Sequence, residues 1–248
     1  MSKKLINKVA VVTGASKGIG AAIAKDLANE GASVVVNYAS SALEAEKVVA
    51  AIIANGGKAL AIQADVSKLA DIERLFSVAN ESFGAIDILV NNAGVYNPGS
   101  LEDIDDAHFY KHFDLNVRGL MLTTKEAVKY FNSTGGSIVN ISSFVSTYGM
   151  ADLSMYSATK GAVDSFTYSL SKELGPRNIR VNNVNPGMVE TEGLHATGFI
   201  EEEDNVKGIT PLGRIGQPED IANAVTFFAS EDSSWITGET LNVSGGLN

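Results

Sequence analysis

Short apolar runs alternate along this chain with longer segments in which apolar residues recur every three or four positions. The first run, KVAVVT at residues 8–13, is β-branched and leads into glycines, which is typical of a buried parallel strand. The longer segments have the spacing of helices with one apolar face. The pattern predicts strands at residues 8–13, 33–38, 58–65, 86–94, 136–142, 179–187 and 238–246. It predicts helices at residues 20–31, 42–54, 71–83, 109–131, 155–174 and 218–230.

Strands and helices in this order predict an α/β fold. Repeated strand–helix–strand units with right-handed crossovers build one doubly wound parallel sheet that helices cover on both faces, here with about seven strands. No linker, repeat or low-complexity segment interrupts the pattern, so we expect one domain over residues 1–248. The poorest match is residues 190–210, which are acidic and follow the carboxyl end of a strand. Because loops at that position bind ligands, we expect a substrate lid at about residues 188–212.

The composition narrows the range of partners. A formal net charge of -10 and a pI near 4.8 disfavour binding to nucleic acid or to an anionic membrane, since both would repel the protein. No stretch approaches the roughly 18 apolar residues of a membrane span, and the short apolar run after the N-terminal lysines indicates a first strand rather than a signal peptide. The chain has no cysteine, which excludes disulfides and thiolate chemistry. We therefore expect a cytoplasmic protein with a small-molecule substrate.

A glycine-rich segment, TGASKGIG at residues 13–20, lies where the first strand turns into the first helix. Gly14, Gly18 and Gly20 let the backbone turn sharply and approach a pyrophosphate, whose charge is stabilised at the helix N-terminus. Such a turn alone is a weak signal, but the first strand-to-helix turn of a doubly wound sheet is where dinucleotides bind. The segment therefore predicts a Rossmann fold with a nicotinamide dinucleotide site. Three more of its residues are expected to line that site: Ser16, Lys17 and Ile19.

The end of the second strand indicates which cofactor binds. An NAD site usually has a carboxylate there, which bonds the adenosine ribose hydroxyl and repels a 2′-phosphate. This chain has Asn37 instead, and Lys17 lies nearby in the glycine segment. We expect NADP(H) to be favoured, with NAD(H) as the alternative if Asn37 only caps the strand. The other residues expected at the adenosine end are Tyr38, Ser40, Ser41, Asp65 and Val66.

Polar residues also follow the later strands, at the edge where open α/β sheets bind ligands. NNAG ends the fourth strand at residues 91–94, Asn116 lies in the next helical segment, and two serines at 142–143 end the fifth strand. Tyr156 and Lys160 are four residues apart and share one helix face. Alone, such a pair is more often an exposed surface pair. All of these residues in this order favour a catalytic site.

The ordered motifs resemble those of the classical short-chain dehydrogenase/reductase family over essentially the whole chain. The resemblance rests on TGxxxGIG at residues 13–20, NNAG at 91–94, Asn116, a serine thirteen residues before a YxxxK motif at 156–160, and a PG turn at 186–187 followed by Thr191. It implies an oxidoreductase whose catalytic residues are Asn116, Ser143, Tyr156 and Lys160, with Ser143 preferred to Ser142 by spacing. The cofactor contacts that it adds are Asn92, Ala93, Gly94, Tyr156, Lys160, Pro186, Gly187, Val189 and Thr191.

The resemblance also implies a role for each catalytic residue. A hydride passes from nicotinamide to a carbonyl carbon, and Tyr156 supplies a proton to the developing alkoxide. A free tyrosine has a pKa of about 10, and we expect the ammonium of Lys160 and the charge of oxidised nicotinamide to lower it. Lys160 is expected to hold the nicotinamide ribose and Ser143 to donate a hydrogen bond to the carbonyl oxygen. Asn116 is expected to hold a water that links Lys160 to solvent.

The substrate is less sharply indicated. Residues that are expected to surround it, although each would also suit ordinary packing, are Val95, Tyr96, Tyr148, Met150, Met188 and Leu194. This mixture predicts a moderately apolar pocket, so we favour a carbonyl reductase or alcohol dehydrogenase acting on a small ketone or aldehyde. A 3-oxoacyl-[acyl-carrier-protein] reductase is the alternative: Arg177 suits an acidic carrier, but residues 131–136 lack a basic residue. A non-catalytic NADP-binding sensor is disfavoured, because all four catalytic residues are present.

Four further features complete the expectations. The resemblance implies a homotetramer, in which Ser244 replaces an aspartate that many relatives have near a C-terminal interface. His108 and His112 have the spacing of a helical metal pair, but no acidic motif accompanies them, so we expect a solvated or interface face and no metal. Trp235 is expected to pack near the last strand. His195 lies in the expected lid, where it would reach substrate or solvent.

Overall fold

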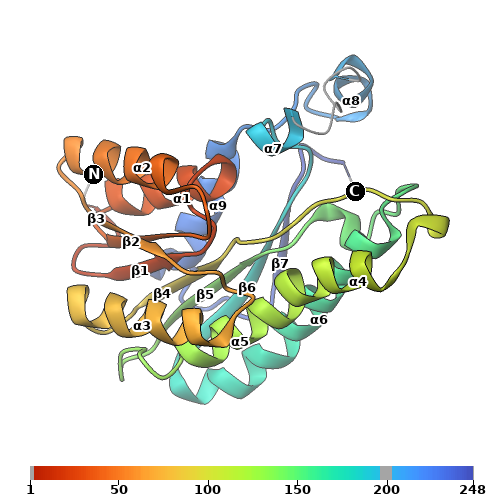
Figure 1. The fold of residues 1–248 in the computed structure, drawn as a ribbon. Helices are drawn as coiled ribbons and strands as arrows, with labels where there is room; N and C mark the ends of the chain where they lie inside the picture. The colour runs from red at the N-terminus through yellow and green to blue at the C-terminus, as the bar shows by residue number, and fades with distance from the viewer. Residues whose placement is uncertain (1–2, 196–202, 248) are drawn as a thin grey trace.

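The computed structural model describes residues 3–195 and 203–247, and within them one sheet organises the chain. Its seven parallel strands have the order β3-β2-β1-β4-β5-β6-β7, which confirms the predicted doubly wound α/β fold (Figure 1). The strands are β1 (Val9–Val12), β2 (Ser33–Tyr38), β3 (Lys58–Gln63), β4 (Ile88–Asn91), β5 (Gly136–Ile141), β6 (Ile179–Pro186) and β7 (Thr240–Val243). Residues 196–202, in the middle of the expected lid, lie outside the described part.

Helices cover both faces of the sheet, because the central strands carry apolar side chains on both sides. Helices α1 (Gly18–Asn29), α2 (Ala42–Ala54) and α9 (Pro218–Ala229) lie on one face, and α3 (Leu69–Phe83), α5 (Leu120–Ala127) and α6 (Ser154–Leu174) on the other (Figure 1). The remaining helices are α4 (Asp106–Phe113), α7 (Glu192–His195) and α8 (Glu203–Ile209). Short turns of helix are η1 (Leu101–Asp103), η2 (Asp114–Gly119), η3 (Phe144–Ser146), η4 (Gly175–Arg177) and η6 (Glu231–Ser233).

The strand order places a crevice between β1 and β4. The chain runs outward from β1 through β2 to β3, and then crosses back to β4 on the other side of β1. The loops that leave the carboxyl ends of β1 and β4 therefore run in opposite directions and leave a gap, which is where ligands bind in such sheets. In the described part of the chain, no helix has the length and apolarity needed to cross a bilayer.

The helix predicted at residues 109–131 is divided into three segments. α4 begins earlier, at Asp106; η2 is a turn of π-helix; and α5 ends at Ala127. Phe131 lies beyond the helix, pairs with Ile86 in an isolated bridge and is buried. A π-turn inserts one extra residue into a helix and commonly marks a functional site. Here it contains Asn116, whose side chain is directed inward by the altered helical phase.

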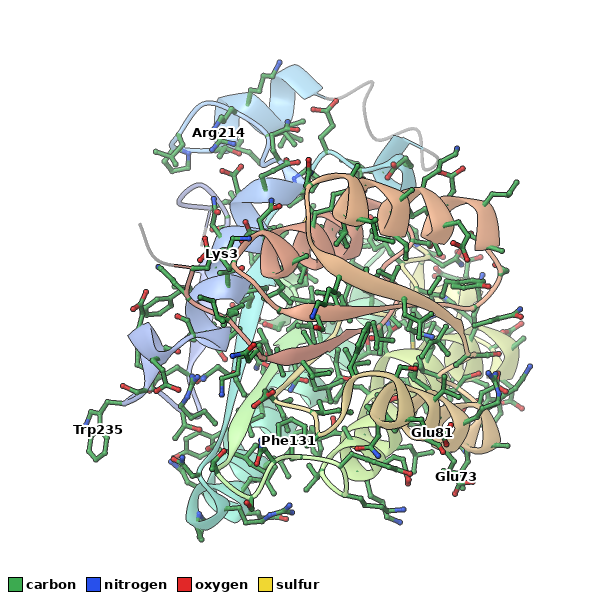
Figure 2. The ribbon with its side chains drawn as sticks, turned by 90° about the vertical axis from the view of Figure 1, so that its left-hand side faces the viewer. Lys3, Glu73, Glu81, Phe131, Arg214 and Trp235 are labelled. Atoms are coloured by element: carbon green, nitrogen blue, oxygen red, sulfur yellow. The ribbon has the colours of Figure 1, made fainter. Side chains whose placement is uncertain are left out.

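Two expectations about surface residues are wrong. Trp235 does not pack on the last strand: it is 99% exposed and projects away from the molecule after η6 (Figure 2). His112 is fully buried instead of solvated, because α4 turns that side chain inward, where its Nδ1 is 2.9 Å from the carbonyl oxygen of His108. The two imidazole rings pack edge to face with centroids 4.6 Å apart.

Candidate active site

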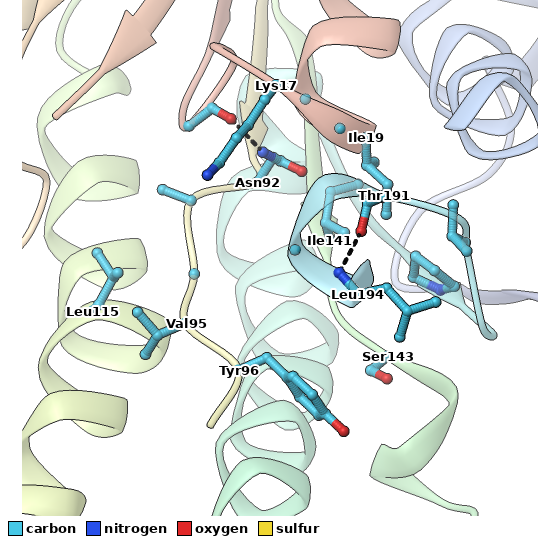
Figure 3. A pocket seen from close by; sticks show the side chains of 18 of the residues that line it. Lys17, Ile19, Asn92, Val95, Tyr96, Leu115, Ile141, Ser143, Thr191 and Leu194 are labelled. Carbon is cyan, nitrogen blue, oxygen red and sulfur yellow. Dashed lines mark hydrogen bonds between the residues drawn. The ribbon is translucent and has the colours of Figure 1, made fainter. Parts of the chain in front are cut away.

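A cavity of about 690 Å³ opens at the carboxyl ends of the central strands. Its volume is in the range of sites for cofactors and drug-sized ligands. Residues that follow β1, β2, β4, β5 and β6 all line it, together with the start of α6 and the segment that contains α7. Figure 3 shows Lys17 and Asn92 at one end of this cavity and Ser143 and Tyr96 at the other. All twenty-one residues predicted to contact the cofactor line it.

The glycine segment forms one wall of the cavity and requires glycine at specific points. Gly14 and Gly18 have φ of +61° and +55°, in the left-handed region that other residues rarely adopt. Gly20 needs no such angle, but a Cβ there would lie 2.5 Å from Nδ2 of Asn92. The segment therefore passes close to β4 and delivers the backbone to the N-terminus of α1, which begins at Gly18.

Thr13 and Asn92 join the glycine segment to the end of β4. The Thr13 hydroxyl oxygen accepts from the backbone N–H groups of Asn92 and Ala93, both at 3.0 Å. Nδ2 of Asn92 donates to the carbonyl oxygens of Thr13 at 2.9 Å and Gly14 at 3.0 Å. Asn92 thus lines the cavity and also fixes the loop that faces it. Thr13 lay inside the sequence motif, but a threonine after a strand carries no signal that separates this role from ordinary strand packing.

Asn37 connects the same loop to the neighbouring strands. Its side chain is 1% exposed. Oδ1 accepts from the N–H of Gly14 at 3.2 Å, and Nδ2 donates to the carbonyl oxygens of Ile62 at 3.3 Å and Ala64 at 3.0 Å. These bonds use both ends of the amide, so the side chain binds backbone rather than extending to a ligand. Lining residues with exposed atoms at this end of the cavity include Lys17, Tyr38, Ser40 and Ser41.

Ser143, Tyr156 and Lys160 meet at the other end of the cavity. Ser143 follows β5 and caps η3, while Tyr156 and Lys160 come from successive turns of α6. The Ser143 side chain is hydrogen-bonded to Tyr156. Nζ of Lys160 donates to the carbonyl oxygen of Ile141 at 2.9 Å and lies 5.5 Å from the centroid of the Tyr156 ring. The hydroxyl of Ser142 is instead used within the protein, since it donates to the backbone carbonyl of Lys160 at 3.1 Å.

The protonation states of the pair differ from the expectation. Burial raises the pKa of Tyr156, the hydrogen bond with Ser143 opposes that shift, and the nearby Tyr96 adds to it. The ammonium of Lys160 lies over the ring and bonds the Ile141 carbonyl, so it does not offset the loss of solvent around the hydroxyl. Among the chain's own groups the pKa of Tyr156 is therefore raised rather than lowered, and the lowering expected with bound oxidised nicotinamide stays a prediction. Burial also lowers the pKa of Lys160, to about 8.

Asn116 holds the loop after β4 instead of facing the cavity. Its Oδ1 accepts from the N–H of Val95 at 2.8 Å, and its Nδ2 donates to the carbonyl oxygen of Val95 at 2.9 Å and to Oγ1 of Thr159 at 3.2 Å. Asn116 is 1% exposed and is not among the residues that line the cavity. Its side chain thus binds protein groups and positions Val95, and its expected role in holding a water stays a prediction.

The wall around Ser143 is largely apolar and aromatic. The Tyr96 ring meets the Tyr156 ring edge to face, with centroids 5.1 Å apart, and Val95, Met150, Met188 and Leu194 also line this end. Tyr148 is not among the residues that line the cavity, and its ring stacks on Phe144 with centroids 5.5 Å apart, so its substrate contact stays a prediction. Lining residues that the sequence analysis did not select include Leu115, Phe144, Val145 and Leu153. The side chain of His195 lies outside the described residues.

These features fit a nicotinamide dinucleotide. The long cavity, the left-handed glycines at the start of α1 and the absence of a carboxylate at Asn37 suit a phosphate-bearing cofactor. The N–H of Leu194 donates to Oγ1 of Thr191 at 3.2 Å, which fixes the wall opposite Asn92 (Figure 3). Among the described side chains, no three histidine, aspartate or glutamate groups converge as metal ligands.

Comparison with known proteins agrees with this geometry. A family model described as "Enoyl-(Acyl carrier protein) reductase" matches residues 14–248. An uncharacterized oxidoreductase of Methylorubrum extorquens is 53% identical, over 98% of this chain and 99% of its own. A probable tetrahydroxynaphthalene reductase of Zymoseptoria tritici is 40% identical, over 98% and 96% of the two chains.

A solved structure adds the fold and a cofactor. A short chain dehydrogenase from Burkholderia cenocepacia, determined in complex with NADP, is 38% identical and has a TM-score of 0.93, covering 99% of each chain. Similarity of this extent in both sequence and structure carries the family assignment. The chain is an oxidoreductase of the short-chain dehydrogenase/reductase family.

Proposed function

We propose that this protein is an NADP(H)-dependent carbonyl reductase that converts a small ketone or aldehyde, preferably one carried on an aromatic ring, to an alcohol. The observation that carries the proposal is the convergence of Ser143, Tyr156 and Lys160 on one cavity that also contains the glycine loop. The aromatic wall around Tyr96 supports a flat apolar substrate, since rings pack well edge to face or offset. The similarity to a tetrahydroxynaphthalene reductase supports the same substrate class.

Each residue has a task that follows from its position. Reduced nicotinamide, when bound, supplies the hydride that adds to the carbonyl carbon. Ser143 donates a hydrogen bond to the carbonyl oxygen, and Tyr156 transfers its proton to that oxygen as negative charge develops there. Because burial raises the pKa of Tyr156, the phenol remains protonated until an alkoxide, which is a stronger base, forms beside it. The ammonium of Lys160 then stabilises the phenolate that remains.

The preference for NADP(H) is proposed from the adenosine end. Asn37 brings no negative charge, and Lys17, Ser40 and Ser41 provide a cation and two hydroxyl groups around the position expected for a 2′-phosphate. The NADP complex of the Burkholderia relative supports this choice. We further propose that residues 188–212 form a substrate lid and that the protein acts as a cytoplasmic homotetramer, as family membership implies.

The carrier-protein reductase remains the second candidate. Arg177 is exposed beyond α6, where its guanidinium donates to the carbonyl oxygen of Val128 at 2.9 Å, and it would offer one positive contact to an acidic carrier. The net charge of -10 opposes such an encounter. A substrate panel of aryl ketones, simple ketones, aldehydes and an acetoacetyl thioester, each with NADPH and NADH, separates the candidates. A sensor would bind NADPH and consume none with any substrate.

The Tyr156→Phe variant tests the mechanism. It removes only the hydroxyl, so we expect the fold and NADPH binding to be kept while turnover of the best substrate falls by at least about a hundredfold. Turnover is followed by the absorbance of reduced nicotinamide, and binding by fluorescence titration. Tyr148→Phe is the matched control, since that tyrosine lies outside the cavity lining, and it should retain turnover. Near-normal turnover by Tyr156→Phe would rule out the mechanism.

A further inference from the structure

A row of buried side-chain hydrogen bonds crosses the sheet behind the active site. Asn91, Asn140 and Asn183 are neighbours in the register of β4, β5 and β6, and all are buried. Nδ2 of Asn91 donates to Oδ1 of Asn140 at 2.8 Å. Nδ2 of Asn140 donates to Oγ1 of Thr167 at 2.7 Å, and that hydroxyl donates to Oδ1 of Asn183 at 2.6 Å. Nδ2 of Asn183 donates to Oδ1 of Asp164 at 3.0 Å.

Every donor in this row points toward Asp164. Successive hydrogen bonds of one direction polarise each other, so the row presents its positive end to the carboxylate. The other carboxylate oxygen, Oδ2, accepts from Nδ2 of Asn185 at 3.2 Å. Two amide donors therefore hold the two oxygens of this carboxylate in place. The arrangement therefore places a negative charge at a defined point on α6.

That charge lies one helical turn from Lys160. Positions four residues apart share one face of a helix, so Asp164 is on the side of α6 that carries the catalytic lysine. Lys160 is 6% exposed and its ammonium donates to a neutral carbonyl oxygen, that of Ile141. A buried cation is costly without an anion nearby. Burial lowers the pKa of Lys160 to about 8, and the carboxylate of Asp164 opposes that shift.

Other ionisable groups also lie around α6. Tyr156 on the same helix and Tyr96 above it are neutral phenols. His112 is on α4 and Asp114 on η2, two elements that pack against α6. The carboxylate of Asp164 is the charged group on α6 itself that raises the pKa of Lys160.

We propose that Asp164 is a positioning residue, oriented by the hydrogen-bonded row, whose negative charge keeps Lys160 a cation at neutral pH. The inference rests on the proposed function for the role of Lys160 in catalysis. It adds to that function a residue that touches neither substrate nor cofactor. Without Asp164, Lys160 should release its proton at lower pH, and the phenolate of Tyr156 should lose its nearby cation there.

The Asp164→Asn variant tests the proposal by two independent readouts. In protein labelled with ¹³C at lysine Cε, and with Lys160 assigned from a Lys160→Met variant, we expect the Lys160 titration to move down by about one pH unit. The decline of kcat/KM for carbonyl reduction on the alkaline side should move down by a similar amount. The NMR titration needs no substrate, so a failure of the proposed function would leave this test of Asp164 intact.

Two matched variants separate charge from structure. Thr167→Val interrupts the same buried row without removing charge, and Glu173→Gln removes a charge from an exposed position of α6. Glu173→Gln should leave the Lys160 titration in place. Thr167→Val should move it by less than Asp164→Asn does, because Asn183 and Asn185 still donate to the charged Asp164, and it should lower the melting temperature. Asp164→Glu keeps the negative charge, so its Lys160 titration should lie close to that of the wild type. If Asp164→Asn does not fold, Asp164→Ser takes its place. An unchanged Lys160 titration in the Asp164 variant, or an equal shift in Thr167→Val, overturns the proposal.

Discussion

Three asparagines near the cavity bind backbone through their amide groups, Asn37 and Asn116 with both the oxygen and the nitrogen and Asn92 with the nitrogen. Asn37, Asn92 and Asn116 each connect the loop of one strand to the loop or strand beside it. An amide carries a donor and an acceptor, so a single side chain can join two backbone segments that would otherwise separate. At the residue scale, then, part of the site consists of residues that set the position of the cavity wall.

At the same scale, one substitution tests the choice of cofactor. Ser40 is exposed at the adenosine end, so Ser40→Asp adds a negative charge with little effect on folding. We expect KM for NADPH to rise at least about tenfold, which corresponds to about 1.4 kcal/mol, and KM for NADH to change much less. Steady-state kinetics with both cofactors measure this. Ser40→Asn is the neutral control, and an equal loss in that variant would contradict a charge effect.

At the scale of elements, the stretch from α4 through η2 to α5 departs from a simple helix. The π-turn gives Asn116 its inward direction, and α4 buries His112 against His108. Nε2 of His112 is buried and has no hydrogen-bond partner among the described groups. An imidazole in this environment is accommodated as the neutral form, because a charged ring would lose its solvation without gaining an acceptor.

The burial of His112 predicts a dependence of stability on pH. Burial and the charges of His108 and Lys111 lower the pKa of His112 below its ordinary 6.5. The unfolded chain then binds more protons than the folded one below about pH 6.5, and the free energy of unfolding should decline as pH falls, by up to about 1.4 kcal/mol per pH unit. His112→Phe should flatten this decline in urea titrations between about pH 7.5 and about pH 5. If the free energy of unfolding falls equally with pH in the wild type and in His112→Phe, this prediction is contradicted.

At the scale of the whole molecule, β7 is an edge strand, and no other strand of the described sheet pairs with its outer edge. Leu241 on this strand is 40% exposed, and Trp235 extends outward just before it (Figure 2). An edge strand with exposed apolar side chains tends to pair with another chain. This supports the proposed homotetramer, with the β7 edge as one of its contact surfaces.

We expect Trp235→Arg to weaken the assembly. The substitution places a charge where a large apolar side chain would be buried between subunits, so light scattering after size-exclusion chromatography should give a smaller mass than for the wild type. Leu43→Arg is the control, because Leu43 is 79% exposed on α2, which packs beside α1 rather than on the β7 edge. An unchanged mass for Trp235→Arg would remove the β7 edge from the proposed interface.

The local pattern was sufficient for most elements. The predicted ranges 33–38 and 42–54 coincide with β2 and α2. A β-branched apolar run favours a buried strand, and an apolar residue at every third or fourth position favours a helix with one buried face. The helix predicted at 109–131 is helical as far as Ala127, but the prediction missed the π-turn, because apolar spacing does not reveal one. The roles proposed for Ser143, Tyr156 and Lys160 stay predictions, although the structure brings the three side chains to one cavity.

The sequence by itself determined the order of strands and helices, the family, and which residue types lie at the carboxyl edge of the sheet. These properties depend on short-range periodicity and on motif spacing, which can be read along the chain. Only the tertiary structure decided that Asn37 and Asn116 bind backbone, that His112 is buried while Trp235 is exposed, and that Asp164 faces the end of a hydrogen-bonded row. Burial and hydrogen-bond partners arise from segments far apart in sequence, so they are settled when the layers pack.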